Sequence, residues 1–562
     1  MKYTLFPHQV EAVQWMRKTE QRPRLVPEQP HGGILAHAMG LGKTMTMMSL
    51  VKAQGLGSTI VVCPKSVLHQ WRDEACRVLQ LEPHSTAIVL YHGVQRQHAL
   101  AASDPHHRLV LTTFDIVRLD CKVSDNGLSL LHQQHWDRVV LDEAHRICEQ
   151  SSKTAKAIRS LRARNRWCVT GTPFKNGVTD LVALSKFLMV PPYCNSTWWR
   201  CHSQNKHKMR EWRTSFLHMQ DKSVLSLPPV QEVVKFAERL PVEQHVNQCL
   251  QALVPLQELE FVVAKQQEHE LLKIMRLRQA ANHPLMLTNS PTAMAYLLTS
   301  PTFTHVPGKC DACKDDMAPP EPPAKRARHA ASKPFCAHHT VCAACQADVF
   351  MCPCCIAEQL NVTTCSNGKT WRHSGKTAVL WDYLVNDVWT TSESRNKVVL
   401  FSQWTTCLDL LALMLDCMGV KYARFDGRVN SIDERGDIIQ QFRGDDECRV
   451  LLTSLGAGGE GLNLIFASHV VLMEPYWNCA VEQQAIDRLH RIGQHDVTHV
   501  LRLLSADSIE DWVQRIQQKK TKELQRLLCG KDATLVDVLV SKETFRVSSP
   551  QAVSTGLAQF LA

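Results

Sequence analysis

The chain has 562 residues, of which 44% are hydrophobic and 21% charged, and its 64 Lys and Arg outnumber its 54 Asp and Glu to give a net charge of +10. At roughly 150 residues per domain this length excludes a single hydrophobic core and predicts three or four units, while the basic balance favours an anionic partner. No stretch approaches the roughly 18 apolar residues of a membrane helix, and the first residues lack the apolar core of a signal peptide. We therefore expect a protein of the cytosol and nucleus that contacts no membrane.

Short apolar runs alternate with amphipathic stretches in two parts of the chain, as is typical of parallel sheets covered by helices. The runs of the first part are 33–36, 59–62, 109–112, 138–141 and 167–170, and those of the second part are 397–401, 420–425, 449–453 and 469–473. Two α/β domains are therefore predicted.

A phosphate-binding loop, HAMGLGKT at residues 37–44, follows the first apolar run. Its glycines free backbone N–H groups to surround phosphates at a helix N-terminus. Lys43 would hold the β and γ phosphates and Thr44 a magnesium ion, although the strict pattern has Gly where this chain has His37. The loop residues predicted to bind the nucleotide are Met39, Gly40, Leu41, Gly42, Lys43 and Thr44.

An acidic pair, Asp142 and Glu143, ends the apolar run at 138–141 and begins the sequence DEAH. This position predicts a magnesium-binding carboxylate, Asp142, and a water-activating carboxylate, Glu143, beside the phosphate loop. The later sequence TGTP at 170–173 agrees with the same site.

Two arginines of the second α/β domain lie in the sequence QAIDRLHRIGQ at 484–494. Gln484, Arg488 and Arg491 are four and three residues apart, so on a helix they would share one face. Guanidinium groups stabilise charge on a transferring γ-phosphate, and arginines supplied by a second lobe would make hydrolysis depend on lobe closure. We therefore predict an ATP site shared between the two domains.

The segment between the two domains has a different composition. Residues 240–285 have leucines at near-helical spacing, whereas 319–328 (PPEPPAKRAR) has too little apolar content to fold and predicts an exposed loop. The basic cluster of this loop, Lys325, Arg326 and Arg328, is typical of a nuclear import signal, with a solvated charge run as the alternative. Nuclear location is the prediction.

Nine of the 22 cysteines crowd into residues 310–365, and the other thirteen are scattered singly. We expect the scattered ones to be buried thiols and the crowd to bind metal. Thiolate and imidazole ligands suit tetrahedral structural zinc, which a segment of roughly 50 residues with little core requires. The predicted ligands are Cys310, Cys313, Cys336, His339, Cys342, Cys345, Cys352 and Cys355. His338 is a rival of His339, and Cys354 would be spare unless it replaces Cys355.

Together these residues resemble a helicase superfamily two ATPase, specifically the SWI/SNF type of double-stranded DNA translocase, over nearly the whole chain. Further blocks that carry the resemblance are LFPHQ at 5–9 with WM at 15–16, VCPKSVL at 62–68 with QW at 70–71, LRQ at 277–279 with NHP at 282–284, GGEGLNL at 458–464 and HRIGQ at 490–494. The resemblance implies two RecA-like lobes that move along duplex DNA without separating its strands. It also implies that Gln9 reads the adenine, that Gly461 contributes to the nucleotide site, and that residues 170–172 couple hydrolysis to movement.

By the same resemblance, side chains of both lobes contact the DNA, namely Lys65, Gln70, Trp71, Thr112, Thr113, Ser402, Gln403, Trp404, Thr453, Asn463 and Trp477. The chain departs from the family at four positions: His37 and Ala38 replace Asp-Glu, Gly456 replaces a basic residue and Glu460 replaces Val. These changes leave the speed of the motor open, but they remove none of the predicted catalytic residues, so an active ATPase is expected.

The order and spacing of the zinc ligands resemble a RING finger. The resemblance implies interleaved sites, one ion held by Cys310, Cys313, Cys342 and Cys345 and the other by Cys336, His339, Cys352 and Cys355. A RING between the lobes resembles the repair translocases typified by helicase-like transcription factor, which are also ubiquitin ligases that bind a ubiquitin-conjugating enzyme. Pro353 fits this pattern, but Ala312 and Ile356 stand where an aliphatic and a basic residue are usual. Ligase activity and a purely structural or partner-binding finger both stay open.

The predicted domains are a first RecA-like lobe (1–190), a helical linker or insertion (191–300), a RING-type zinc finger with a basic Pro-rich loop (301–370), a second RecA-like lobe (371–530) and a C-terminal tail (531–562). The predicted function is ATP-dependent translocation on duplex DNA that remodels or displaces DNA-bound proteins or chromatin. The alternatives are an RNA or strand-separating helicase of the same superfamily, and a ubiquitin ligase or scaffold held on DNA by the lobes.

Overall fold

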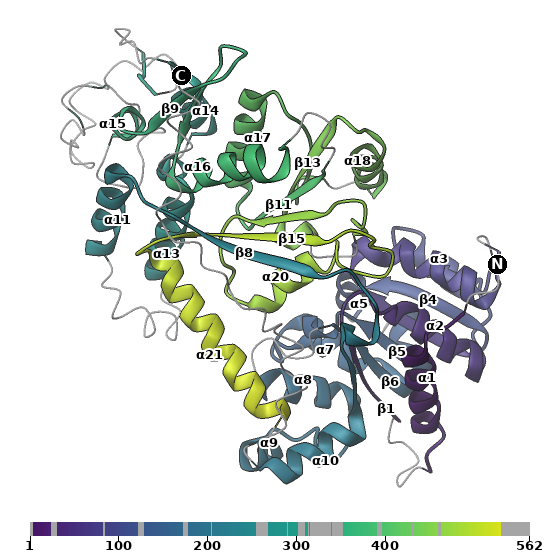
Figure 1. Cartoon of the computed structure of the whole chain (residues 1–562). Coiled ribbons are helices and arrows are strands. Elements are labelled where there is room, and N and C mark those ends of the chain that lie inside the picture. Colours follow the sequence, from purple (N-terminus) through teal and green to yellow (C-terminus); the bar gives the residue numbers. More distant parts are fainter. Residues whose placement is uncertain are drawn as a thin grey trace, which may run out of the picture.

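Two parallel sheets, each covered by helices, form two lobes, coloured purple to blue and green to yellow in a computed structural model of the chain (Figure 1). The structure describes residues 4–23, 31–82, 85–121, 129–171, 178–203, 205–253, 268–288, 290–301, 309–312, 314, 336, 339, 352–390, 396–429, 432–458 and 462–529. The predicted pair of α/β domains is confirmed. Within these residues, no helix combines the length and the apolar character needed to cross a membrane.

The sheet of the first lobe has seven strands in the order β3-β4-β2-β5-β6-β1-β7, and every pair of neighbours is parallel. Successive side chains of its strands enter two different apolar cores, as Ile34 and Leu35 do. Helices cover both faces, which explains the continuous apolar runs. The strands are β1 (His31–His37), β2 (Ser58–Cys63), β3 (Ile88–Leu90), β4 (Arg108–Thr113), β5 (His135–Asp142), β6 (Arg162–Val169) and β7 (Leu217–Gln220).

The helices of the first lobe connect these strands. Several begin at a capping side chain, as when Ser152 accepts a hydrogen bond from Ala155 N. The helices are α1 (Pro7–Glu20), α2 (Lys43–Gln54), η1 (Lys65–Val67), α3 (Leu68–Leu79), α4 (Arg96–Ala101), α5 (Phe114–Asp120), α6 (Leu130–Gln133), η2 (Ala144–Ile147), α7 (Lys153–Ser160), α8 (Val178–Leu188), α9 (Ser196–His202) and α10 (Lys206–Phe216).

The sheet of the second lobe has six parallel strands in the order β12-β13-β11-β14-β15-β8. Its strands are β8 (Val230–Ala237), β11 (Val398–Ser402), β12 (Lys421–Phe425), β13 (Cys448–Ser454), β14 (His469–Leu472) and β15 (Thr498–Ser505). Its helices are α16 (Gly375–Asp382), η7 (Tyr383–Val388), α17 (Thr405–Met418), α18 (Ile432–Gly444), α19 (Leu455–Gly458), α20 (Cys479–Ile486) and α21 (Ile509–Cys529).

The segment 191–300 is more than the helical linker that the sequence predicts, because it supplies one edge strand to each sheet. β7 pairs with β1 in the first lobe, and after η3 (Lys222–Val224) β8 pairs with β15 in the second. β8 carries polar side chains between its apolar ones, so it lacks the continuous apolar run of an inner strand. The remaining helices, α11 (Pro241–Leu253), α13 (Glu268–Asn282), η5 (Pro284–Leu287) and α14 (Pro291–Thr299), pack on the core of the second lobe.

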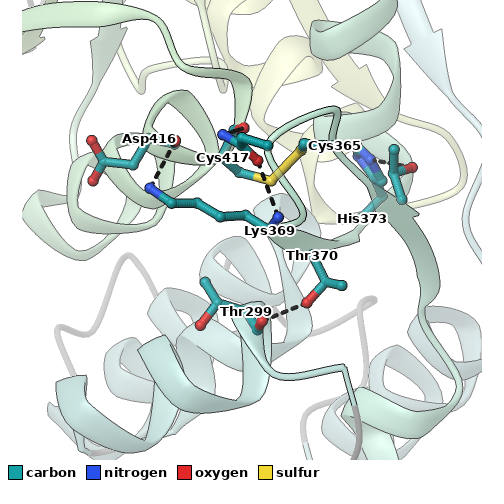
Figure 2. Close-up of a disulfide and its surroundings, with 9 residues drawn as sticks. Thr299, Cys365, Lys369, Thr370, His373, Asp416 and Cys417 are labelled. Atoms are coloured by element: carbon teal, nitrogen blue, oxygen red, sulfur yellow. Dashed lines mark hydrogen bonds between the residues drawn. A yellow bond between two sulfur atoms is a disulfide. The ribbon is translucent and has the colours of Figure 1, made fainter.

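Helix α15 (Pro353–Glu358) and the hairpin of β9 (Asn361–Thr364) and β10 (Thr370–His373) follow the cysteine-rich segment and join the same core. The hairpin turn brings Cys365 to the C-terminal end of α17, where it forms a disulfide with Cys417 (Figure 2). Lys369 Nζ donates a hydrogen bond to Asp416 O at 3.3 Å beside the bridge. The expectation of a scattered, unpaired thiol at Cys417 is therefore wrong.

The other scattered cysteines only partly match the expected buried thiols. Cys63, Cys168, Cys407 and Cys448 are buried free thiols, whereas Cys201 is exposed. The burial of a cysteine can be predicted from the apolar residues of the strand around it. The disulfide between Cys365 and Cys417 cannot, because it joins segments 52 residues apart and has no local signature.

Candidate active site

The phosphate loop lies between β1 and α2, and two of its glycines are required by close contacts. Gly40 has a φ of 87° and Gly42 a φ of 73°, in the left-handed region that favours glycine. A Cβ at position 40 would lie 2.7 Å from Cβ of Arg491, and a Cβ at position 42 would collide with the side-chain amide of Gln9. The loop is therefore enclosed by α1 on one side and by the second lobe on the other.

Gln9 is positioned on α1 against this loop. Its Nε2 donates to Leu41 O at 3.0 Å, while its Oε1 accepts from Phe6 N at 3.0 Å. His8 Nε2 lies 3.2 Å from the same Leu41 O. The structure thus brings the predicted adenine-contact residue to the phosphate loop, and its contact with adenine stays a prediction.

Lys43 begins α2, and its Nζ donates to His37 O at 3.0 Å and to Ala38 O at 3.3 Å. Burial lowers the pKa of Lys43, and the nearby acidic pair acts in the opposite direction. A Cβ at Gly171 would lie 3.3 Å from the same Nζ, so the TGTP sequence begins against the loop. Residues 172 and 173 lie outside the described part of the chain.

The acidic pair lies at the end of β5, facing Lys43. Asp142 Oδ2 accepts a hydrogen bond from Trp71 Nε1 at 2.7 Å, which fixes the orientation of this carboxylate. Glu143 has a left-handed φ of 50°, an uncommon backbone for a residue with a side chain, and its Oε2 lies 3.2 Å from His145 Nδ1. Backbone strain of this kind gathers at functional sites.

The two carboxylates have opposite pKa shifts. Burial and the neighbouring Glu143 raise the pKa of Asp142 to about 6. Burial also disfavours ionisation of Glu143, but the contact with His145 and the charge of Lys43 outweigh it and hold the pKa of Glu143 at about 2. Glu143 is therefore the more readily ionised member of the pair, and its negative charge suits a group that orients water. The carboxylate of Asp142 and the hydroxyl of Thr44 are oxygen donors, which fits a hard cation such as magnesium.

The two arginines lie in a turn and not on the predicted helix face. Helix α20 ends at Ile486, soon after Gln484, and the chain then turns. Lys222 of the linker pairs with Asp487 at 2.8 Å, and His490 Nε2 lies 2.9 Å from Pro228 O. These contacts from the segment between the lobes end the helix and hold the arginine turn in place.

This turn reaches across to the first lobe. Besides the contact of Arg491 with Gly40, the charge of Arg488 affects the pKa values of Lys43 and Glu143, as only a nearby group can. Burial lowers the pKa of Arg491, as does its neighbour Arg488. The structure thus gathers the phosphate loop, the acidic pair and both arginines between the lobes. Gly461 lies outside the described residues.

Four of the eight predicted zinc ligands form a second cluster. Cys336, His339, Cys352 and Cys355 have ligand atoms that all lie within 4.8 Å of one another. The Sγ atoms of Cys336 and Cys355 are 3.3 Å apart, and His339 Nδ1 lies 3.4 Å from Cys355 Sγ. Three sulfurs and one imidazole suit tetrahedral zinc. The cluster is the set that the RING resemblance groups around one ion, with Cys355 and not Cys354 as its last member.

The remaining predicted ligands are only partly described. Cys310 is fully buried, whereas Cys313, Cys342, Cys345 and the rival His338 lie outside the described residues. Outside the cluster, His339 Nε2 lies 3.2 Å from Glu358 Oε1, a contact that orients the ring with Nδ1 toward the sulfurs.

Comparisons with known proteins identify the family of the chain. Residues 8–286 match the SNF2-related domain, and residues 375–493 match the helicase conserved C-terminal domain. A relative named "Probable global transactivator" from Orgyia pseudotsugata multicapsid polyhedrosis virus is 30% identical, and the match covers 92% of this chain and 90% of the relative. The chain belongs to the SNF2-related family of helicase-type ATPases.

Two longer relatives of this SNF2-related chain are DNA repair protein RAD5B of Arabidopsis thaliana and the helicase-like transcription factor of Mus musculus. The first is 31% identical over 89% of this chain and 45% of its own length, and the second is 29% identical over 85% and 52%. The chain spans about half the length of these relatives.

The first departure from the family pattern, His37, is a neutral side chain at the end of β1. It is fully buried, and its Nε2 lies 3.0 Å from His218 Nδ1 of β7. Burial, followed by the charge of His218, lowers the pKa of His37 to about 2. The SNF2-related chain thus replaces an acidic position with an uncharged imidazole pair between two strands. Ala38 follows it, and Gly456 is exposed, while Glu460 lies outside the described residues.

The predicted DNA contacts of this SNF2-related chain fall into two groups. Lys65, Gln70 and Asn463 are exposed, and Gln403, Trp404 and Trp477 are half-buried. The buried group is Trp71, Thr112, Thr113, Ser402 and Thr453. The Trp71 side chain is 1% exposed and bonds Asp142, so its prediction as a DNA contact is wrong. The QW spacing identified the residue but not the direction of its indole.

Trp404 and Trp477 lie in two loops of the second lobe, and both of their rings contact the same cation, Arg278. The guanidinium of Arg278 lies 5.9 Å from the ring of Trp404 and 4.5 Å from that of Trp477, and it donates to Pro475 O at 2.7 Å. Arginine stacked on indole faces gains cation–π energy when desolvated. Helix α13 therefore fixes both tryptophan loops through this one side chain.

A buried carboxylate, Glu474, ties the same two loops together. It accepts hydrogen bonds from Ser402 Oγ at 3.0 Å and Asn282 Nδ2 at 2.8 Å, and also from Gln403 N. Lys376 Nζ completes the network by donating to Asn282 Oδ1, Met473 O and Glu510 Oε1. The LRQ and NHP blocks stand out in the sequence, but this role does not. The four-residue spacing of Arg278 and Asn282 on α13 is the signal available for it.

Lys376 offers a test of how strongly this network stabilises the fold. We expect Lys376→Met to lower the free energy of unfolding by about 3–5 kcal/mol, because it leaves the fully buried Glu510 without its cation. Urea unfolding followed by circular dichroism measures this loss. Lys369→Met is the matched control, since Lys369 is exposed and should change stability little. Equal stability of the two variants would contradict the network.

Proposed function

We propose that this chain couples ATP hydrolysis to movement along duplex DNA, and so displaces or remodels proteins bound there without separating the strands. The observation that carries the proposal is the contact of Arg491 with Gly40, which makes the ATP site depend on the arrangement of the lobes. The anchored loops of Trp404 and Trp477 in the same second lobe support a DNA-contacting role for that lobe.

The described residues divide the chemistry between the lobes. Lys43 and the loop N–H groups would hold the phosphates, while Asp142 and Thr44 would hold magnesium, whose charge helps to neutralise the phosphates. Glu143 would orient the attacking water and accept its proton. The guanidinium groups of the arginine turn stabilise the developing charge only while the lobes are closed, so hydrolysis and product release would drive closing and opening.

The proposal is tested by the nucleic acid that stimulates ATP hydrolysis. We expect duplex DNA to raise the ATPase rate more than single-stranded DNA or RNA of equal length. Displacement of the third strand from a DNA triplex without unwinding of a forked duplex measures translocation directly. A preference for RNA, or unwinding of the fork, would favour the alternative helicase and overturn the proposal.

The cysteine-rich segment is proposed to hold two zinc ions. The clustered Cys336, His339, Cys352 and Cys355 would bind one, and the set that includes Cys310 would bind the other. Three sulfurs at such short separations would otherwise repel as thiolates, which supports a cation among them.

Native mass spectrometry tests this proposal without reference to activity. We expect two zinc ions per wild-type chain and a loss of one ion in Cys336→Ala, because each ion has four ligands. Cys354→Ala is the matched control: Cys354 is fully buried in the same module but lies outside the ligand set, so this variant should keep both ions. Loss of zinc from Cys354→Ala with retention in a Cys355→Ala variant would reverse the assignment.

The module also bears on the ligase alternative. Ala312 is fully buried and Ile356 is 1% exposed, so neither offers a side chain to a ubiquitin-conjugating enzyme. Their burial supports a structural module that packs on the second lobe. Ubiquitin chains formed by the wild type, and lost in Cys310→Ala but kept in Lys43→Ala, would instead support the ligase.

Nuclear location is proposed from the duplex-DNA substrate and from the basic cluster at 325–328, which lies outside the described residues. Chromatin is then a natural partner. A fluorescent fusion that stays nuclear after Lys325, Arg326 and Arg328 are replaced by alanine would remove the cluster from this proposal.

A further inference from the structure

Helix α21 runs from the second lobe to helices α9 and α10 of the first lobe (Figure 1). Its 21 residues span about 30 Å, and it contacts α13 near its start and α10 further along. Near its start, the ring of Trp512 meets that of Trp477 edge-on at 5.6 Å, and Gln517 donates to Tyr476 O. The helix therefore extends from the tryptophan loop of one lobe to the surface of the other.

Three cations form a stripe on the outer face of α21. Arg515, Lys519 and Lys522 are exposed and are four and three residues apart, so they share one face over about 10 Å. The opposite face is buried through Val513, whereas Trp512 lies one turn before Arg515 and packs on Trp477. Residues 512–522 contain four Lys and Arg and no Asp or Glu. This stretch, which Asp511 and Glu523 flank, is uniformly basic, whereas a solvated helix surface usually mixes both signs of charge.

The helices that α21 approaches on the first lobe are basic as well. Helix α10 has four Lys and Arg against one Glu, and that Glu211 is already paired with Lys208 at 3.0 Å. Arg210 of α10 and Arg200 of α9 are exposed. Among the described residues, no carboxylate forms an ion pair with Arg200, Arg210 or the three cations of the α21 stripe.

We propose that these cations form a basic ridge, comprising Arg200, Arg210, Arg515, Lys519 and Lys522, that binds the phosphate backbone of duplex DNA. The proposal rests on the proposed function and adds a contact surface outside the residues assigned to DNA from the sequence. Each strand of a duplex carries one charge per 3.4 Å along the axis, so a 10 Å stripe matches about three phosphates of one strand. Because the ridge includes residues of both lobes, DNA bound along it contacts both of the lobes that are proposed to open and close.

The ridge fits nucleic acid better than a protein partner. Interfaces between proteins have apolar cores that exclude water. Among the side chains that the structure describes, which on α21 end at residue 522, none of the exposed large hydrophobic ones belongs to α9, α10 or α21. Cations without apolar neighbours are typical of phosphate contacts, which position a protein on a duplex without reading its sequence.

The test uses the full chain and a fluorescent duplex, with affinity measured by anisotropy between 50 and 200 mM salt, a range chosen because phosphate contacts are salt-dependent. We expect Arg515→Glu with Lys519→Glu to lower the slope of log affinity against log salt by about two, and to weaken binding about 10- to 100-fold near 0.1 M salt. Arg17→Glu with Lys18→Glu is the matched control. Both of its cations are exposed on α1, and it should bind as wild type does.

A second variant, Lys519→Gln with Lys522→Gln, removes two charges without reversing them and should lower the slope by the same amount. It shows whether the effect of the Glu variant comes from misfolding. If duplex DNA stimulates the wild-type ATPase but the ridge variants keep wild-type affinity and slope, the ridge is wrong while the proposed function stands. If duplex DNA fails to stimulate the wild type, the proposed function itself fails. Weakening confined to single-stranded RNA would also overturn the duplex assignment.

Discussion

Arg491→Ala is expected to lower kcat for ATP hydrolysis by about 10³-fold or more, the magnitude associated with loss of an arginine that reaches the transferring phosphate from another lobe. Cβ of Arg491 lies against Gly40 of the phosphate loop, its Nη1 donates to Leu462 O at 3.4 Å, and burial lowers its pKa, so the guanidinium lies beside the loop where water is largely excluded. The KM for ATP should change much less than kcat, because the loop and Lys43 still hold the phosphates.

Steady-state ATPase measurements at saturating duplex DNA check this effect. Arg428→Ala is the matched control: Arg428 is an exposed arginine of the same lobe, paired with Asp409 at 2.8 Å, and its loss should leave kcat near the wild-type value. A kcat for Arg491→Ala equal to that of the control would mean that the second lobe plays no part in the chemistry.

Glu143→Gln is expected to lower kcat by about 10²- to 10⁴-fold while ATP still binds. The amide keeps the size of the side chain but cannot accept a proton, and the structure gives Glu143 the low pKa of an ionised group beside His145 and Lys43. ATP should then accumulate on the enzyme, which filter binding measures.

Glu149→Gln provides the comparison for that variant. Glu149 is an exposed carboxylate of the same lobe that bonds only Ser151 in its turn, so its replacement should not change the rate. If Glu143→Gln hydrolyses ATP as fast as Glu149→Gln, then another group activates the water and Asp142 becomes the candidate.

Sequence reasoning was most successful where the signal is local. Buried parallel strands have continuous apolar runs, so the two sheets were visible from segments such as 59–62 and 398–401. A phosphate loop needs glycines at set positions, so the sequence pattern alone identifies Gly40 and Gly42. The grouping of Cys336, His339, Cys352 and Cys355 likewise followed from ligand spacing and the RING resemblance.

The failures share a different cause, because each depends on contacts between distant segments. The arginine turn was predicted as a helix, since spacing alone does not reveal that Lys222, 265 residues earlier, pairs with Asp487. Strand β8 was missed because polar residues interrupt it, so that it has neither a continuous apolar run nor a regular alternation. Trp71 was predicted to face DNA although its indole points inward to Asp142. The disulfide of Cys365 with Cys417 is of the same kind.

We propose that the site between the lobes hydrolyses ATP in response to duplex DNA. The most direct measurement compares the ATPase rates of the wild type and Lys43→Ala with and without a duplex. Lys43 begins α2 and faces Asp142 and Glu143 at the centre of the site. We predict a wild-type rate that rises with duplex DNA and a Lys43→Ala rate that stays at background under both conditions. Equal rates for the two proteins, or a wild-type rate indifferent to duplex DNA, would contradict the account.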